Sequence, residues 1–328
     1  MSARAPAPRC ASRPACTTRW ARLASRLALA LALLGALTVP VAHAAVRVVI
    51  VEGLGGEPVY ARQFDEQARV LADASRALHG QQAVELLSGM DATRARILES
   101  FRELSKRMRR ADQLIVYLIG HGGFDGRQYK FNVPGPDLSD ADLRALLQAS
   151  PAERQLLIVT GSASGALLTS LSAPHRVLIT ATRTGDEKNV TRFGAAFTAA
   201  LHSPEADTDK DGYISAEEAF AFAQRAVQDA YRRDQLLASE HATLSGSAAR
   251  AFVLASLSPQ APSGGAPAAS AVPAQWLRQR AALNASIAAL EARKGSLTPE
   301  VYEQRLQALL LQLAQLQQQI DQASSHVP

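Results

Sequence analysis

The sequence contains almost no cysteine, because its 328 residues include only Cys10 and Cys16. Both lie in the first 44 residues, which also carry six arginines, no acidic residue, the apolar run LALALALLGALTVPV and the small-residue end AHA. This order is typical of a bacterial secretory signal peptide, so we predict export to the periplasm or the extracellular space, with cleavage near Ala44. The exported chain would have no disulfide, no cysteine metal ligand and no thiolate nucleophile.

A long apolar segment and an excess of charge are also missing. The apolar run of the leader has about 15 residues, fewer than the roughly 20 that span a bilayer, so we expect no stable membrane span in the mature form. Without the six arginines of the leader, the 35 basic residues fall to 29, against 30 acidic ones. A nearly neutral mature chain gives no indication of a nucleic-acid partner.

Short apolar runs alternate with amphipathic segments between residues 45 and 257. Continuous apolar strands of this kind are typical of a parallel sheet that is buried on both faces. Helical spacing between the runs, with Asp91 and Ser139 as candidate N-caps, predicts helices that cover both faces. We therefore predict one α/β domain with a mainly parallel sheet sandwiched by helices, and its strands within 46–53, 83–89, 113–120, 155–161 and 176–182.

The last 70 residues have a different composition. Residues 258–274 are rich in Pro, Ala, Gly and Ser and have no apolar periodicity, which is typical of a linker. Residues 275–323 show leucines at three- and four-residue spacing in two segments, and Thr298 and Pro299 begin the second. This pattern predicts a helical hairpin or short coiled coil. A hairpin that packs on itself and a module for self-association or partner binding both fit.

Three of the predicted strands end in polar, glycine-rich segments, at residues 120–126, 161–165 and 181–189. Because carboxyl ends of parallel strands meet at one edge of a sheet, we expect these segments to lie together. His121 is the candidate general base, and the backbone at Gly122 and Gly161 is a candidate oxyanion site. The charged residues of the third segment are candidates for contact with a substrate or partner: Arg183, Asp186 and Glu187. A structural histidine and a solvated loop are the alternatives.

The order of these segments resembles the caspase-like (clan CD) cysteine peptidases, and most closely the legumain-type peptidase C13 family. The resemblance rests on the strand that ends in His121-Gly122 and on TGSASG at residues 160–165, where the family pattern is Asp-Ala-Cys-x-Ser-Gly. It covers about residues 46–256 and implies a three-layer α/β fold, a histidine base and a cysteine nucleophile. In this chain Ser162 stands at the cysteine position and Thr160 at that of the aspartate.

The serine at the nucleophile position leaves two functions open. A thiol has a pKa near 8.5 and needs only a nearby histidine, whereas a hydroxyl needs a base that a third group orients, for which Asp125 is a candidate. The Gly-x-Ser-x-Gly motif of serine hydrolases is absent. We therefore expect a catalytically impaired pseudopeptidase that binds a peptide or protein. The alternative is an active peptidase or transpeptidase with Ser162 as nucleophile and His121 as base.

The segment DTDKDGYISAEE, residues 207–218, matches the spacing of an EF-hand calcium loop. Calcium prefers several oxygen ligands, and this spacing supplies three aspartates, a backbone carbonyl and a glutamate. We predict a structural Ca²⁺ that stabilises the loop, with ligands from Asp207, Asp209, Asp211, Tyr213, Ser215 and Glu218. A solvated acidic turn is the alternative.

Overall fold

The computed structural model describes residues 44–257 and 298–325, together with the separate positions 276, 279, 283, 286, 287 and 290. The predicted signal peptide, except Ala44, and the predicted linker, residues 258–274, lie outside the described residues.

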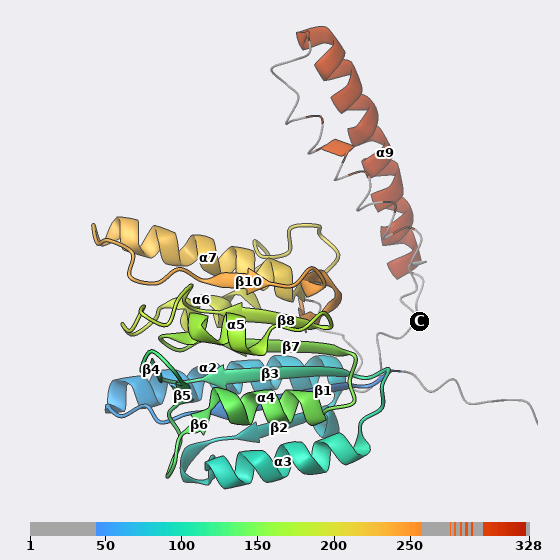
Figure 1. Ribbon diagram of the computed structural model, residues 1–328. Helices are drawn as coiled ribbons and strands as arrows, with labels where there is room; N and C mark the ends of the chain where they lie inside the picture. Colours follow the sequence, from blue (N-terminus) through green and yellow to red (C-terminus); the bar gives the residue numbers. More distant parts are fainter. Residues whose placement is uncertain are drawn as a thin grey trace, which may run out of the picture. The chain divides into compact units, whose positions relative to one another are not determined.

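The centre of the domain is a six-stranded sheet (Figure 1). Five strands pair in parallel, and β10 pairs antiparallel with β8 at one edge. The order across the sheet is β10-β8-β7-β3-β1-β2. The predicted, mainly parallel sheet is thereby confirmed, with strands β1 (Val46–Glu52), β2 (Val84–Leu87), β3 (Gln113–Ile119), β7 (Arg154–Val159), β8 (Arg176–Thr180) and β10 (Thr243–Ser245).

Helices cover both faces of the sheet, because alternate residues of each strand point to opposite sides. In β1, Val48 and Ile50 belong to one apolar cluster, and Val49 and Val51 belong to the other. The first cluster includes residues of α2 (Pro58–His79), α6 (Phe193–Ala200) and α7 (Ala216–Arg233). The second includes residues of α3 (Arg94–Arg107), α4 (Asp140–Ala149) and α5 (Leu167–Leu171). This is the predicted three-layer arrangement.

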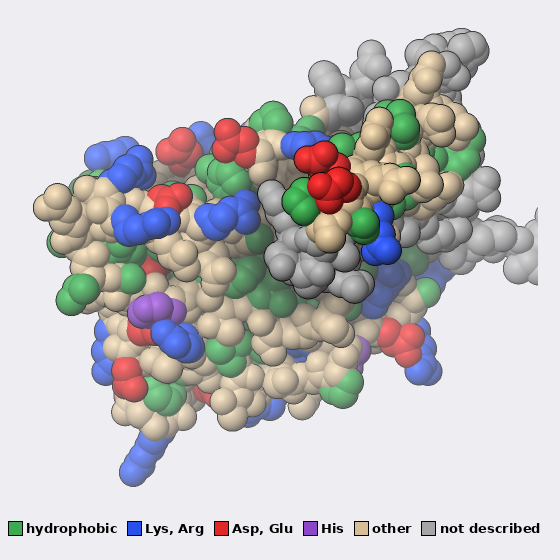
Figure 2. Space-filling view, turned by 90° about the horizontal axis from the view of Figure 1, so that it is seen from above, with side chains coloured by type: hydrophobic (Ala, Val, Ile, Leu, Met, Phe, Trp, Pro, Cys, Tyr) green, Lys and Arg blue, Asp and Glu red, His purple; other side chains and the backbone are tan. Residues whose placement is uncertain are grey.

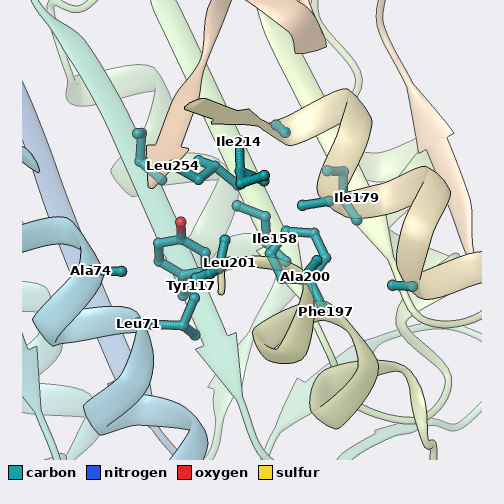
Figure 3. Close-up of a cluster of buried hydrophobic side chains, with 14 of the residues drawn as sticks. Leu71, Ala74, Tyr117, Ile158, Ile179, Phe197, Ala200, Leu201, Ile214 and Leu254 are labelled. Atoms are coloured by element: carbon teal, nitrogen blue, oxygen red, sulfur yellow. The ribbon is translucent and has the colours of Figure 1, made fainter. Parts of the chain in front are cut away.

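The first cluster joins strands and helices that are far apart in the sequence. Figure 3 shows Leu71 of α2 and Tyr117 of β3 near Ile158 of β7 and Phe197 of α6, all buried. Burying a side chain of this size stabilises a fold by about 1.5–3 kcal/mol. The cluster therefore fixes the central strands relative to the helices on this face.

Two small sheets were not predicted. One contains β4 (Gly122–Phe124), β5 (Tyr129–Phe131) and β6 (Leu138–Ser139), which follow β3 directly. The other pairs β9 (Tyr213–Ser215) with β11 (Val253–Ser256) and closes the end of the predicted calcium loop. All five strands have two to four residues, too few for an alternating pattern to be read from the sequence.

Helix boundaries agree with the sequence at Ser139 and differ at Asp91. Ser139 caps α4 and forms a reciprocal capping box with Asp142. The expected cap at Asp91 is wrong, because Asp91 lies in a 3-10 turn and Thr93 accepts the hydrogen bond from the Arg96 amide. Either side chain could satisfy the first free amides of a helix, and the intervening turn decides which one does.

The described part of the C-terminal segment consists of α9 (Pro299–Ser325), Thr298 directly before it and the six separate positions named above. Leu283 and Leu316 are buried together, with Trp276, Leu309 and Leu313 packed against them. These contacts bring the two predicted segments of the hairpin together. No helix within the described ranges has the length and apolar character needed to cross a bilayer.

The surface carries both signs of charge. Figure 2 shows basic and acidic side chains interspersed over the coloured part of one face, without a broad area of a single sign. This distribution agrees with the balanced composition of the chain after residue 44.

His79, in the last turn of α2, makes the stability of the fold depend on pH. Burial lowers its pKa from 6.5 to about 4. The unfolded chain therefore takes up a proton on this side chain at a higher pH than the folded chain does. We expect stability to be lost as the pH falls from about 6.5 to about 4, by about 2–3 kcal/mol from this group.

Urea unfolding at pH 7.5 and at pH 4.5 would measure this loss. In His79→Gln the difference between the two pH values should shrink by that amount, whereas His202→Gln, at an exposed histidine, should leave it unchanged. An unaltered pH dependence in His79→Gln would show that His79 is not responsible.

Candidate functional site

The three polar segments lie at adjacent strand ends, because β3, β7 and β8 are neighbours in the sheet. Their backbones touch. A Cβ atom added to Gly161 would lie 2.3 Å from the Gly120 carbonyl oxygen. One added to Gly165 would lie 2.2 Å from the carbonyl carbon of Arg183. Only glycine permits such close approach, so these glycines bring the segments together.

His121 follows β3 and is held by the segment after β1 and by α2. Its Nε2 lies 3.2 Å from the Gly55 carbonyl oxygen. A carbonyl can only accept, so Nε2 carries the proton and Nδ1 of the neutral ring is left as an acceptor. The edges and faces of Tyr60 and Phe64 enclose the ring, at centroid distances of 5.2 and 5.0 Å. The imidazole is therefore fixed in one tautomer and one orientation.

Asp125 does not orient His121, and that expectation was wrong. Asp125 is exposed, and its Oδ1 accepts hydrogen bonds from the amides of Arg127 and Gln128 at 2.9 and 2.8 Å. These bonds, that from Gln128 first, hold its pKa below the usual value. Asp125 shapes its own turn, and the neutral Gly55 carbonyl takes the place expected for a carboxylate.

Ser162 lies in the turn after β7 and is 5% exposed. Among the described residues its hydroxyl group has no hydrogen-bond partner, and His121 forms no hydrogen bond other than that to Gly55 with its side chain. The next residue, Ala163, has a left-handed backbone with φ of 55°, and its amide donates to the Glu187 carbonyl at 2.8 Å. The tight turn thus positions Ser162 without engaging its side chain.

Ser164 has a structural role. It is fully buried, and its Oγ lies 3.3 Å from the Thr182 hydroxyl and accepts from the Thr182 amide at the same distance. The bonds join the turn after β7 to the end of β8. Of the two serines in this segment, only Ser162 has a hydroxyl group without a hydrogen bond to another described residue.

The third segment is fixed by Glu187. Its Oε2 accepts hydrogen bonds from the amides of His241 and Arg183, at 2.8 and 3.2 Å, and its Oε1 lies 3.1 Å from the His241 Nδ1. Glu187 therefore holds the loop to the segment before β10, whereas Arg183 and Asp186 are exposed and able to contact a ligand. The sequence did not indicate His241, which lies 54 residues away and carries no motif.

Two aromatic residues of the site were also missed. Phe124 packs against Gly185, where an added Cβ would lie 2.3 Å from its ring. Tyr129 is 1% exposed, and its hydroxyl, which has no partner among the described residues, would lie 2.2 Å from a Cβ added to Gly122. Burial raises the pKa of Tyr129. Both aromatic residues belong to the small sheet that was not predicted, and no pattern in the sequence indicates their positions.

The predicted calcium loop brings its three aspartates together. One carboxylate oxygen from each of Asp207, Asp209 and Asp211 lies within 4.8 Å of the others. Asp207 is 5% exposed and accepts hydrogen bonds from the Asp211 and Gly212 amides, at 3.1 and 3.0 Å. Burial raises the pKa of Asp211 to about 6, and the neighbouring carboxylates add to this effect. Crowded carboxylates of this kind suit a hard divalent cation, which relieves their repulsion.

Glu218 and Ser215, which were predicted as calcium ligands, form hydrogen bonds at the start of α7 in the structure. Ser215 caps α7, and the Glu218 Oε2 accepts from the Ser215 amide and hydroxyl at 3.0 and 2.8 Å. The Glu218 Oε1 accepts from the amide and hydroxyl of Thr208, both at 2.9 Å. Burial opposes ionisation of Glu218, but these bonds outweigh it and lower its pKa. Tyr213 begins β9. The described cluster thus contains three of the six predicted ligands.

Comparisons with known proteins do not assign a family. No protein-family model matches this chain, and no curated protein matches it. Among solved structures, protein GSU0716 from Geobacter sulfurreducens, a structural genomics target, is similar to it with a TM-score of 0.41 and 14% sequence identity. That alignment covers 67% of this chain and 98% of the other.

Proposed function

We propose that the domain is a pseudopeptidase, a module that binds an extended peptide or protein segment at the edge formed by His121, Ser162 and Arg183 without cleaving it. The observation that carries the proposal is the hydrogen bond from the His121 Nε2 to the Gly55 carbonyl. It defines what kind of nucleophile this histidine is able to activate.

A neutral carbonyl orients the ring but adds little stabilisation to an imidazolium ion. A histidine that activates a serine gains that stabilisation from a buried carboxylate. A thiol, in contrast, is acidic enough to need only an oriented imidazole. No carboxylate is bonded to His121 within the described part of the chain. The site is therefore suited to a thiol, and a serine at position 162 leaves the nucleophile weak.

Exposed apolar side chains next to the residues that contact His121 support a binding role. Leu54 and Val59 flank the segment that holds the ring, and they are 41% and 51% exposed. The exposed Arg183 lies on the other side of the strand ends. A peptide with an apolar and an acidic side chain would contact Leu54 and Val59 with the one and Arg183 with the other.

We further propose that the EF-hand-like loop binds a structural Ca²⁺ and that the leader directs export of the protein. A Ca²⁺ bound by Asp207, Asp209 and Asp211 would fix the connection between α6 and α7, with a structural role and no part in catalysis. Composition of the first 44 residues supports export from a bacterial cell, where free calcium is available to such a site.

A fluorophosphonate probe, which labels activated serines, distinguishes binding from hydrolysis. We expect no labelling of the wild-type protein that depends on Ser162. Labelling that disappears in Ser162→Ala would overturn the proposal in favour of the serine hydrolase.

Binding is measured separately, with the protein applied to an immobilised array of decapeptides and then titrated with the best-bound peptide in solution. Leu54→Asp and Arg183→Glu should each weaken that binding by about tenfold or more, a loss of about 1.4 kcal/mol. Met90→Asp, at a 76% exposed apolar residue beyond the edge strand β2, is the control and should bind like the wild type. Equal binding by all variants would place the ligand elsewhere.

A further inference from the structure

A cavity of about 660 Å³ lies at the opposite end of the sheet from the candidate functional site. Its walls come from the first half of β1, the turn before β2 with the start of β2, and one side of α3 from Arg96 to Arg107. Arg47 is the second residue of β1, whereas Gly55 and the rest of the candidate functional site follow the carboxyl ends of the strands. A volume of this size accommodates a small molecule.

Two buried donors in this cavity have no partner. The Arg47 Nε and the Ser100 Oγ are both inaccessible to solvent and form no hydrogen bond with any described residue. Ser100 as a whole is 4% exposed. A buried polar group without a partner destabilises a fold by about 1–3 kcal/mol, and native proteins contain few of them. Here two such groups line one cavity, and an arginine N–H can only donate.

Acidic residues of the lining already have partners. Glu85 pairs with Arg96 at 3.8 Å, and Glu103 pairs with Lys106 at 2.5 Å. The Arg47 guanidinium, in contrast, has one hydrogen bond, from NH1 to the Gln82 carbonyl at 3.2 Å, and no carboxylate within reach among the described residues. Arg107, at the end of α3, also lines the cavity and forms no ion pair within the described ranges. The lining as a whole has three arginines against two glutamates, so one positive charge is in excess.

We propose that this cavity binds a small oxyanion, through the carboxylate or phosphate oxygens of its ligand. The Arg47 Nε–H and the Ser100 hydroxyl group donate to the same anionic group, and Arg107 adds attraction from the rim. Hydrogen bonds to a charged acceptor are about twice as strong as those between neutral groups, so an anion is the acceptor that would satisfy these donors best. Carboxylate and phosphate share this chemistry, and the two arms of the test separate them.

Ser100 as an anion ligand and Ser100 as a structural residue lead to different expected melting temperatures for Ser100→Ala. A ligand-free cavity leaves its hydroxyl group unsatisfied, so Ser100→Ala should melt at the same or a higher temperature than the wild type in chloride buffer. The same substitution should weaken anion binding several-fold. A serine that only supports the helix would instead lower the melting temperature and leave anion binding unchanged.

The test is thermal unfolding of the purified protein with inorganic phosphate in one arm and citrate in the other, at constant ionic strength set with sodium chloride. We expect a saturable rise in melting temperature in at least one arm. The half-maximal concentration should increase at least tenfold in Arg47→Gln. Arg62→Gln removes the same charge from the exposed surface of α2 and should respond like the wild type.

A response to phosphate alone assigns a phosphate ligand, a response to citrate alone assigns a carboxylate, and a response to both assigns the shared chemistry. No saturable rise in either arm up to about 10 mM, tenfold above a 1 mM Kd, would overturn the proposal. A rise that is equal in wild type, Arg47→Gln and Ser100→Ala would do the same. Ser100→Ala keeps the test decisive should Arg47→Gln fail to fold.

Discussion

Replacing Ser162 by cysteine should convert the protein into a peptidase. The His121 Nδ1 is available as an acceptor, and the ring is held by Gly55, Tyr60 and Phe64. A thiol with a pKa near 8.5 loses its proton to such a base, whereas a hydroxyl does not. General-base assistance contributes about 10²–10⁴-fold, so we expect peptide hydrolysis at least about 100-fold above the wild type. A pool of fluorogenic peptides would measure it.

Two controls connect this gain to the proposed geometry. Ser164→Cys places a thiol two residues away, at a buried position bonded to Thr182, and should remain inactive. His121→Ala in the Ser162→Cys background should abolish the activity. Should Ser162→Cys react with iodoacetamide no faster than a free thiol and hydrolyse nothing, the His121 and Ser162 positions would lack the chemistry that we infer.

Calcium should raise the stability of the protein, and chelation should lower it. Binding to the folded state at 100 times the Kd contributes about 2.7 kcal/mol, and at 1,000 times about 4.1 kcal/mol. Because the Asp207, Asp209 and Asp211 carboxylates converge within 4.8 Å, removing the cation leaves their repulsion uncompensated. Thermal unfolding in calcium and in chelator should therefore give clearly separate transitions.

Asp209→Asn tests the assignment, because it removes one charged ligand and leaves the backbone of the loop unchanged. The calcium-dependent rise in melting temperature should be mostly lost in this variant. Asp186→Asn removes an exposed acidic side chain from the loop after β8 and should keep the full response. Identical transitions with calcium and with chelator in the wild type would show that the loop binds no calcium.

The sheet could be predicted because its central strands are continuous apolar runs. VRVVIVE and QLIVYLI are seven-residue runs rich in β-branched and apolar residues, as expected for strands buried on both faces, whereas the three residues of β10 have no such pattern. His121 and Ser162 could be placed at one edge by the same argument. The group that orients His121 could not be predicted from the sequence. It is the backbone carbonyl of Gly55, 66 residues earlier, and no side chain marks its position.

The hydrogen-bond partners of the charged residues could not be predicted from the sequence either. Glu187 and Arg183 are close neighbours in a polar loop, and both were candidates for ligand contact. Only the fold brings the amide of His241 to Glu187 and leaves Arg183 exposed. Pairings of this kind depend on how distant loops meet, which periodicity does not encode.

The strand β1 supplies residues to both ends of the sheet. Arg47 lines the cavity at its start, and Gly55 holds His121 just beyond its end. At about 3.3 Å per residue the two ends of this strand are about 20 Å apart. Substitutions at such a separation, without shared partners, contribute additively to the free energy of unfolding. A double variant at Arg47 and His121 should thus equal the sum of the single ones, and an observed excess would measure energetic coupling along the strand.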